Sequence, residues 1–180
     1  MSIKLDVAVL AKAKQIKLAI FDVDGVLTDG SLLLGANGDE YKAVHAHDGM
    51  GLVMLRQSGC HVAIISGRSS RAFAQHMSNL GVEHVHQGVR DKVKVFKKLL
   101  VQLSLTEKEA AYVGDDFIDL PVMRCVGLAC AVADAHPLVI EHAHWITKNN
   151  GGRGAVREIC ELIMRAKGTF DSQLQKFLVE

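Results

Sequence analysis

Residues 18–30 read LAIFDVDGVLTDG, an apolar run that ends in two carboxylates, Asp22 and Asp24. Four apolar residues followed directly by acidic side chains are typical of a buried parallel strand that ends in a functional turn. Because residues i and i+2 of an extended chain point the same way, the two carboxylates are expected to converge on one site. The segment therefore predicts both a strand and the centre of a site.

Similar apolar runs recur along the chain, with helical patterns between them. The predicted strands are residues 18–21, 62–65, 110–113, 126–132 and 145–146, and the predicted helices are residues 49–57, 69–79, 91–103, 118–124 and 155–166. This alternation predicts an α/β fold with a doubly wound parallel sheet. Residues 31–45 differ, because a turn-rich Gly-Ala-Asn-Gly stretch at 35–38 separates two short apolar stretches, and they predict a protruding β-hairpin.

Size and composition favour one soluble domain over residues 1–180, with a polar tail from about residue 168 to 180 that is either free or docked on a partner. The formal net charge of +1 gives no reason to expect nucleic acid or a membrane as partner, and no apolar run reaches transmembrane length. Four cysteines without a CxxC pair indicate reduced thiols, and so the cytoplasm.

Polar residues follow the predicted strands at their carboxyl ends, where open α/β sheets place their ligands. Asp22 and Asp24 follow the first strand, Ser66 and Gly67 the second, and Lys92 begins a helix. Asp115 lies in a Gly-Asp-Asp turn at 114–116 that follows a further strand. The sequence therefore predicts that several strand ends contribute side chains to one site.

These residue types suit phosphate chemistry. A carboxylate nucleophile and a phosphate ester repel each other in a low-dielectric cleft unless cations intervene, and Mg²⁺ and Lys92 would supply them. We expect Asp22, Asp115 and the backbone carbonyl of Asp24 to hold the Mg²⁺, and Ser66 with the amides near Gly67 to hold the phosphoryl oxygens.

Asp22 is then the expected nucleophile and Asp24 the general acid and base, while Asp119 orients Lys92 or a metal-bound water. For Asp116, support of the site and capping of the next helix are both open. The histidine pairs at 84–86 and 142–144 have a spacing that could indicate zinc ligation, but neither has an evident third ligand nearby in the sequence.

The ordered set resembles the haloacid dehalogenase superfamily, through DxD at 22–24, Ser66, Lys92 and GDDxxD at 114–119. Gaps of this size exclude a separate cap domain, so neighbouring subunits are expected to complete the site. The segments at 22–30, 114–123, 132–137 and 151–158 are similar, within the superfamily, to capless phosphatases of sugar-acid phosphates.

That resemblance implies a homotetramer assembled through the hairpins, sites at subunit boundaries, a sugar-acid phosphate as substrate, and a role in lipopolysaccharide synthesis. It also implies that the tail can approach a neighbouring subunit's site. The expected substrate contacts are His45, His47, Asp48, Gly49, Arg68 and His76.

His47 and His76 stand where arginine is commoner in that group, which leaves the identity of the sugar acid open. The other hypotheses are a phosphatase of a different sugar-acid phosphate, and a non-catalytic module such as a receiver or a tetrameric scaffold. Asp24 argues against a receiver, because a second acid placed for hydrolysis would discharge a phosphoaspartate.

Overall fold

A six-stranded parallel sheet forms the centre of the computed structural model, which describes residues 6–178. Its strands lie in the order β5-β4-β1-β6-β7-β8. Their bounds are β1 Leu18–Phe21, β4 His61–Ile65, β5 His84–His86, β6 Ala110–Gly114, β7 Leu128–Ala131 and β8 Trp145–Ile146. The order reverses at β1, and in such sheets ligands bind beyond the carboxyl ends of the strands at the reversal. The doubly wound parallel sheet predicted from the sequence is confirmed.

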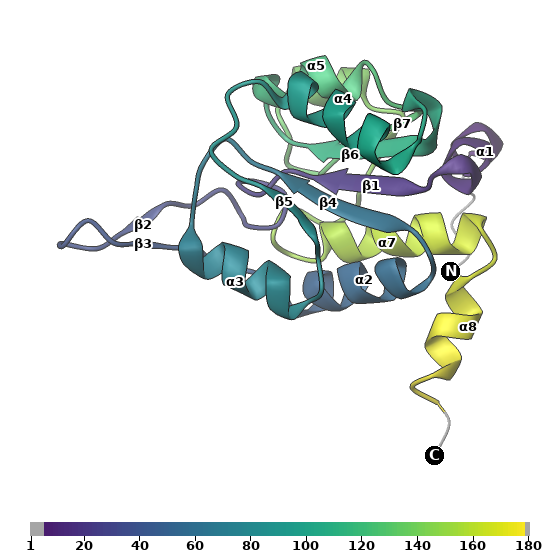
Figure 1. Cartoon of the computed structure of the whole chain (residues 1–180), viewed down its shortest axis with the longest axis horizontal. Helices are drawn as coiled ribbons and strands as arrows, with labels where there is room; N and C mark the ends of the chain where they lie inside the picture. The colour runs from purple at the N-terminus through teal and green to yellow at the C-terminus, as the bar shows by residue number, and fades with distance from the viewer. Residues whose placement is uncertain (1–5, 179–180) are drawn as a thin grey trace.

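Helices cover both faces of this sheet (Figure 1). On one face lie α2 (Ala46–Gln57), α3 (Arg71–Asn79) and α7 (Ala155–Ala166), and α1 (Val7–Gln15) packs against α7. On the other face lie α4 (Lys92–Leu103) and α5 (Leu120–Met123), with α6 (Pro137–His142) beside α5. Because both faces are covered, all residues of β1, β6 and β7 are buried, which explains their continuous apolar runs.

The predicted hairpin is present and projects from the body of the molecule (Figure 1). Its strands, β2 (Leu33–Leu34) and β3 (Glu40–Tyr41), pair antiparallel with Leu33 opposite Tyr41. The apolar side chains Leu33, Leu34 and Tyr41 are 56%, 73% and 59% exposed. No cap domain covers the sheet edge within the described residues.

Several element bounds differ from the predictions. The predicted helix at 118–124 is a 3-10 turn, η2 (Phe117–Asp119), followed by the short α5, because the Asp116 carboxylate caps the turn. The predicted strand at 126–132 is shorter in the structure, because Gly127 packs against the backbone of Lys108 in the 3-10 turn η1 (Glu107–Glu109) and Val132 falls just beyond the strand end. The helices α1 and α6 and the strand β5 were not predicted.

The tail forms a further helix, α8 (Phe170–Gln175), which packs on its own chain. The Gln173 side-chain amide donates to the Gln57 carbonyl at the end of α2, and Phe170 is buried beneath Arg165. Residues 179–180 of the predicted tail lie outside the described residues. None of the helices between residues 6 and 178 combines the length and apolar character needed to cross a bilayer.

Candidate active site

Asp22 lies at the carboxyl end of β1, between the ends of its two neighbouring strands. The register pairs Phe21 with Ile64 of β4 and with Val113 of β6, so Asp22 follows at the point where the strand order reverses. The side chain is 3% exposed. Its Oδ1 lies 2.9 Å from the Lys92 ammonium. A carboxylate this buried is stable only with such a partner.

Lys92 starts α4 and is held by a second carboxylate, that of Asp119. Its Nζ lies 2.8 Å from Asp119 Oδ1, and the Tyr112 hydroxyl donates to the same oxygen at 2.7 Å. Burial alone would lower the pKa of Lys92, but the carboxylates of Asp119 and Asp22 more than offset it and raise the pKa. Lys92 therefore stays a full positive charge at the sheet edge.

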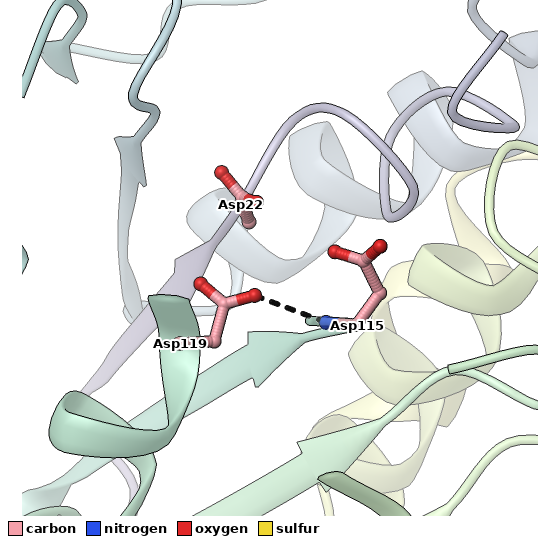
Figure 2. A group of neighbouring side chains, drawn as sticks. All are labelled: Asp22, Asp115 and Asp119. Carbon is pink, nitrogen blue, oxygen red and sulfur yellow. Dashed lines mark hydrogen bonds between the residues drawn. The ribbon is translucent and has the colours of Figure 1, made fainter. Parts of the chain in front are cut away.

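Three carboxylates meet at this point (Figure 2): Asp22, Asp115 and Asp119 each place one oxygen within 4.8 Å of the others. Burial, and next the charge of Asp119, raise the pKa of Asp22 to about 7, although Lys92 opposes the shift. Burial and the charges of Asp119, Asp22 and Asp116 raise the pKa of Asp115 to about 8. One ammonium is thus too little positive charge for three ionised carboxylates.

The donor set fits Mg²⁺. Asp115 Oδ1 is buried without a hydrogen-bond partner among the described residues, which suits a metal ligand. Asp22 also offers a carboxylate oxygen, and Mg²⁺ takes one or two carboxylates and otherwise prefers water and phosphate oxygens. Asp119 is engaged elsewhere, because its Oδ2 accepts from the backbone N–H groups of Asp115 and Asp116 at 3.1 and 3.3 Å. Asp22 and Asp115 are therefore the residues best placed to hold the ion.

Asp24 faces the hairpin. Its carboxylate forms an ion pair with Lys42, which follows β3 and is 6% exposed in its side chain. Lys42 also lies 3.1 Å from Glu40, and Glu40 pairs with the Arg68 guanidinium beyond the end of β4. The hydrogen bonds from Arg68 and Lys42 lower the pKa of Glu40. The metal-binding carbonyl expected at Asp24 stays a prediction.

Ser66 and Gly67 form the turn after β4, next to the end of β1. Ser66 is 2% exposed, and its hydroxyl accepts the N–H of Arg68 at 3.3 Å. Its backbone N–H donates to the His86 carbonyl of β5, which fixes the turn to the sheet. The strand register brings this turn, Asp22 and Lys92 to one edge, as the sequence predicted for the strand ends.

The residues expected to contact the substrate differ in how exposed they are. Arg68 and His47 are exposed, and His76 is half-buried in the wall of a cavity of about 180 Å³ between α3 and the hairpin. The rings of His45 and His47 meet edge to face at 4.9 Å at the start of α2. Gly49 is buried and packs against Leu80 of α3.

Asp48 points inward instead of toward the site. It is 1% exposed and accepts hydrogen bonds from the N–H groups of Gly154 and Arg157 at 3.1 and 2.7 Å. Both its oxygens serve the first turn of α7, where a carboxylate complements the helix dipole. The geometry thus gives Asp48 a structural partner rather than free acceptors for a substrate.

The turn before α7 also holds the Asp22–Gly30 loop. Gly152 donates its N–H to the Val26 carbonyl at 2.9 Å, and Arg153 forms an ion pair with Asp29 at 2.9 Å. A Cβ at Gly151 would overlap the Gly25 carbonyl oxygen. Arg153 thus has a structural partner in the same loop.

Three residues of this network escaped the sequence prediction: Glu40, Lys42 and Tyr112. Glu40 and Lys42 stand two apart in the stretch that includes β3, so in an extended chain their side chains share a face, and this spacing could have indicated them. Tyr112 interrupts an apolar buried strand, and a buried hydroxyl needs a polar partner.

Asp116 is exposed and caps η2 through its bond to the Phe117 N–H at 2.7 Å.

The histidine pairs do not form a metal cluster with other residues among those described. His84 and His86 stand two apart on β5, so their side chains share one face of the strand, and both are half-buried. His144 Nδ1 accepts the N–H of Ala129 at 2.9 Å, which ties the start of β8 to β7. His142 is exposed, and its Nδ1 lies 2.8 Å from the Leu138 carbonyl oxygen.

Comparison with known proteins places these features in a family. Residues 84–159 match the model of a haloacid dehalogenase-like hydrolase family. The 3-deoxy-D-manno-octulosonate 8-phosphate phosphatase of Escherichia coli (strain K12) is 48% identical over 163 residues, which cover 91% of this chain and 87% of the relative.

Solved structures support the same family assignment as the sequence comparisons. The enzyme of that name from Yersinia pestis superposes with a TM-score of 0.91 at 44% identity, over 93% of this chain and 90% of that one. The Moraxella catarrhalis enzyme, solved in complex with a magnesium ion, a phosphate ion and a KDO molecule, gives a TM-score of 0.91 at 40% identity, over 94% and 97% of the two chains. By identity, coverage and fold, this chain belongs to the 3-deoxy-D-manno-octulosonate 8-phosphate phosphatase family of the haloacid dehalogenase superfamily.

Proposed function

We propose that this chain is a Mg²⁺-dependent phosphatase that hydrolyses 3-deoxy-D-manno-octulosonate 8-phosphate to the free sugar acid and phosphate. The observation that carries the proposal is the buried Asp22 carboxylate at the switch point of the sheet, beside Lys92 and Asp115. Relatives nearly half identical over nine-tenths of the chain bear the name of this activity, and a further enzyme of that name, 40% identical, was solved with magnesium, phosphate and KDO.

Hydrolysis would proceed in two displacements. Asp22 attacks phosphorus, the bond between phosphorus and the sugar oxygen breaks, and Asp24 gives that oxygen a proton. Water then attacks the aspartyl-phosphate, Asp24 takes the proton of the water, and the bond from Asp22 to phosphorus breaks. Ser66, the amide of Gly67 and Lys92 hold the phosphoryl oxygens.

A Mg²⁺ ion held by Asp22 and Asp115 would neutralise negative charge shared by the phosphate and the carboxylates. The other residues act through position and charge. Asp119, with Tyr112, fixes the Lys92 ammonium toward Asp22, so that the nucleophile and the phosphate clamp keep one geometry. Asp116 supports the same turn from outside as its cap.

The nucleophile is tested by replacing Asp22 with Asn, which keeps the shape of the side chain and removes its charge. We expect Asp22→Asn to fold, with a thermal transition as sharp as that of the wild type, and to lose kcat on the octulosonate phosphate by more than about 1,000-fold. Lys97→Met, on the exposed face of α4, is the control. Phosphate release by Asp22→Asn at the wild-type rate would refute the assignment.

A second candidate is a phosphatase of another sugar-acid phosphate. The observation that favours it is the cavity beside the hairpin, whose wall holds the imidazole of His76 at a position where arginine is commoner among the related phosphatases. Comparison of kcat/KM for the octulosonate phosphate and for its close sugar-acid analogues decides between the two. Uniformly weak turnover of all of them would contradict both candidates.

We also propose that residues 1–180 act as one catalytic domain in a homotetramer, with each site completed by a neighbouring subunit. The exposed Leu33, Leu34 and Tyr41 of the hairpin support this assembly, because apolar side chains on a projecting hairpin need a partner surface. A role in lipopolysaccharide synthesis and a cytoplasmic location go with the proposed substrate. Buried, unpaired thiols at Cys60, Cys130 and Cys160 agree with a reducing compartment.

A further inference from the structure

The side chain of Lys42 is almost fully covered although the residue lies on the projecting hairpin. Lysine is almost never this covered unless its charge is paired, and the side chain of Lys42 is 6% exposed. Its ammonium contacts the Asp24 carboxylate and lies 3.1 Å from Glu40. These two carboxylates offset the cost of removing the ammonium from water.

Asp24 depends on this contact for its orientation. Lys42 bonds to Oδ1 of Asp24, and within residues 6–178 no other side chain donates to this carboxylate. The contact leaves Oδ2 of Asp24 for another partner. Glu40 shares the ammonium, so the positive charge of Lys42 is divided between two carboxylates. Glu40 is fixed in turn by Arg68, which joins the hairpin to the turn after β4.

We propose that Lys42 is a positioning residue for the acid and base step: it holds Asp24 with one oxygen free to face the leaving oxygen of the substrate. This rests on the function proposed above. A general acid acts only within hydrogen-bond reach of the atom that it protonates, and such groups contribute about 10²–10⁴-fold in rate. The docking of the hairpin on the body of the enzyme thereby becomes part of the catalytic geometry, because the lysine that orients Asp24 is carried by the hairpin.

The consequence is a dependence on the leaving group. An alkoxide leaving group, as in the octulosonate phosphate, needs a proton as the bond to phosphorus breaks, whereas 4-nitrophenolate leaves without one. A misplaced Asp24 should therefore slow the first reaction far more than the second. A lysine that only stabilises the fold would change both rates by the same factor.

The test compares Lys42→Met, Lys42→Arg and the control Lys97→Met on three substrates: the octulosonate phosphate, phenyl phosphate and 4-nitrophenyl phosphate. We expect Lys42→Met to lose about 100-fold in kcat/KM on the octulosonate phosphate. The loss should be smaller on phenyl phosphate and no more than about threefold on 4-nitrophenyl phosphate. Lys42→Arg keeps a donor and should recover most of the lost rate. Lys97→Met should match the wild type throughout.

Equal losses on all three substrates, or none on any, would overturn the proposal. Circular dichroism and light scattering of each variant show whether the fold and the assembly are kept, and Lys42→Arg provides the comparison if Lys42→Met misfolds. If the wild type hydrolyses the phenyl esters but not the octulosonate phosphate, the proposed substrate is wrong. The ratio of the two phenyl esters in Lys42→Met still tests the role of Lys42.

Discussion

The Lys92 ammonium sits between two buried carboxylates, and its position also depends on a hydroxyl from β6. Tyr112 reaches from the middle of β6 to Asp119 Oδ1, which also contacts Lys92. Asp119 thus gathers donors from Tyr112, Lys92 and the backbone of the turn after β6. Such a network specifies one geometry only if every member stays paired.

Removal of the Tyr112 hydroxyl should weaken this hydrogen-bond network but leave the Lys92–Asp119 ion pair in place. We expect Tyr112→Phe to lower the free energy of unfolding by about 1–2 kcal/mol, because Asp119 keeps its bond to Lys92 but loses one donor. For a chain of this length that corresponds to a fall of about 2–8 °C in melting temperature. Calorimetry measures it, and a melting temperature equal to that of the wild type would contradict the network.

The raised pKa values of Asp22 and Asp115 predict a pH dependence for the metal-free protein. Both pKa values, about 7 and about 8, lie above the ordinary value of 3.8, so the native state holds protons that the unfolded state has lost. This contribution to stability is fully present below about pH 4 and is lost as the pH rises through about 7 and 8. The melting temperature in EDTA should therefore fall as the pH rises from about 4 to about 8.

Mg²⁺ binds the ionised carboxylates, so the gap in melting temperature between Mg²⁺ and EDTA should widen from about pH 5.5 to about pH 8.5. Thermal melting at a series of pH values measures both trends. Asp115→Asn is the matched control, because it removes the group with the higher pKa and should flatten the upper part of the curve. A constant gap would mean that these two carboxylates do not bind the ion.

At the scale of elements, the turn before α7 connects three parts of the chain. Gly151 donates its N–H to Asp134 at 2.9 Å, Gly152 to Val26, and Gly154 to Asp48. The loop that carries Asp22 and Asp24 is therefore clamped from behind by backbone contacts. A clamp of this kind leaves no room for a side chain at Gly151.

Gly151→Ala should displace the Asp22–Gly30 loop, because the added methyl would overlap the Gly25 carbonyl oxygen and rigid backbone surrounds it. We expect a loss of about 1–3 kcal/mol in the free energy of unfolding and a fall in kcat. Gly35→Ala is the matched control, since its methyl would meet neighbours at 3.4 Å, an ordinary contact. Similar stability and kcat in both variants would show that the clamp is unnecessary.

The sequence predicts helices and strands correctly where the hydrophobic pattern is strong. It misses features that depend on tertiary contacts. The runs at 18–21 and 110–113 and the helix at 155–166 match β1, β6 and α7 within one residue, since both faces of the strands are buried and α7 has an amphipathic pattern. The short β5 was missed, because only three residues pair with β4 and two of them are histidines. The inward turn of Asp48 depends on the position of α7, which no local pattern encodes.

For the molecule as a whole, the projecting hairpin links assembly to the site. Its outer face carries the exposed, paired residues Leu33 and Tyr41, while its inner face carries Glu40 and Lys42, which reach Arg68 and Asp24. A charge on the outer face should therefore break the proposed tetramer without touching the ion pairs of the inner face. Assembly and chemistry are then separable by the choice of hairpin residue.

Leu33→Asp tests this separation. Leu33 is 56% exposed, so in an isolated subunit the substitution costs little, whereas at a subunit interface it buries an unpaired carboxylate. We expect the mass from light scattering to fall from that of a tetramer to that of smaller species, and kcat/KM for the octulosonate phosphate to fall with it if a neighbour completes the site. Val101→Asp, at a valine 81% exposed on α4, should keep the wild-type mass and rate. A tetramer that survives Leu33→Asp would place the interface elsewhere, and full activity in a dissociated Leu33→Asp protein would show that one subunit holds a complete site.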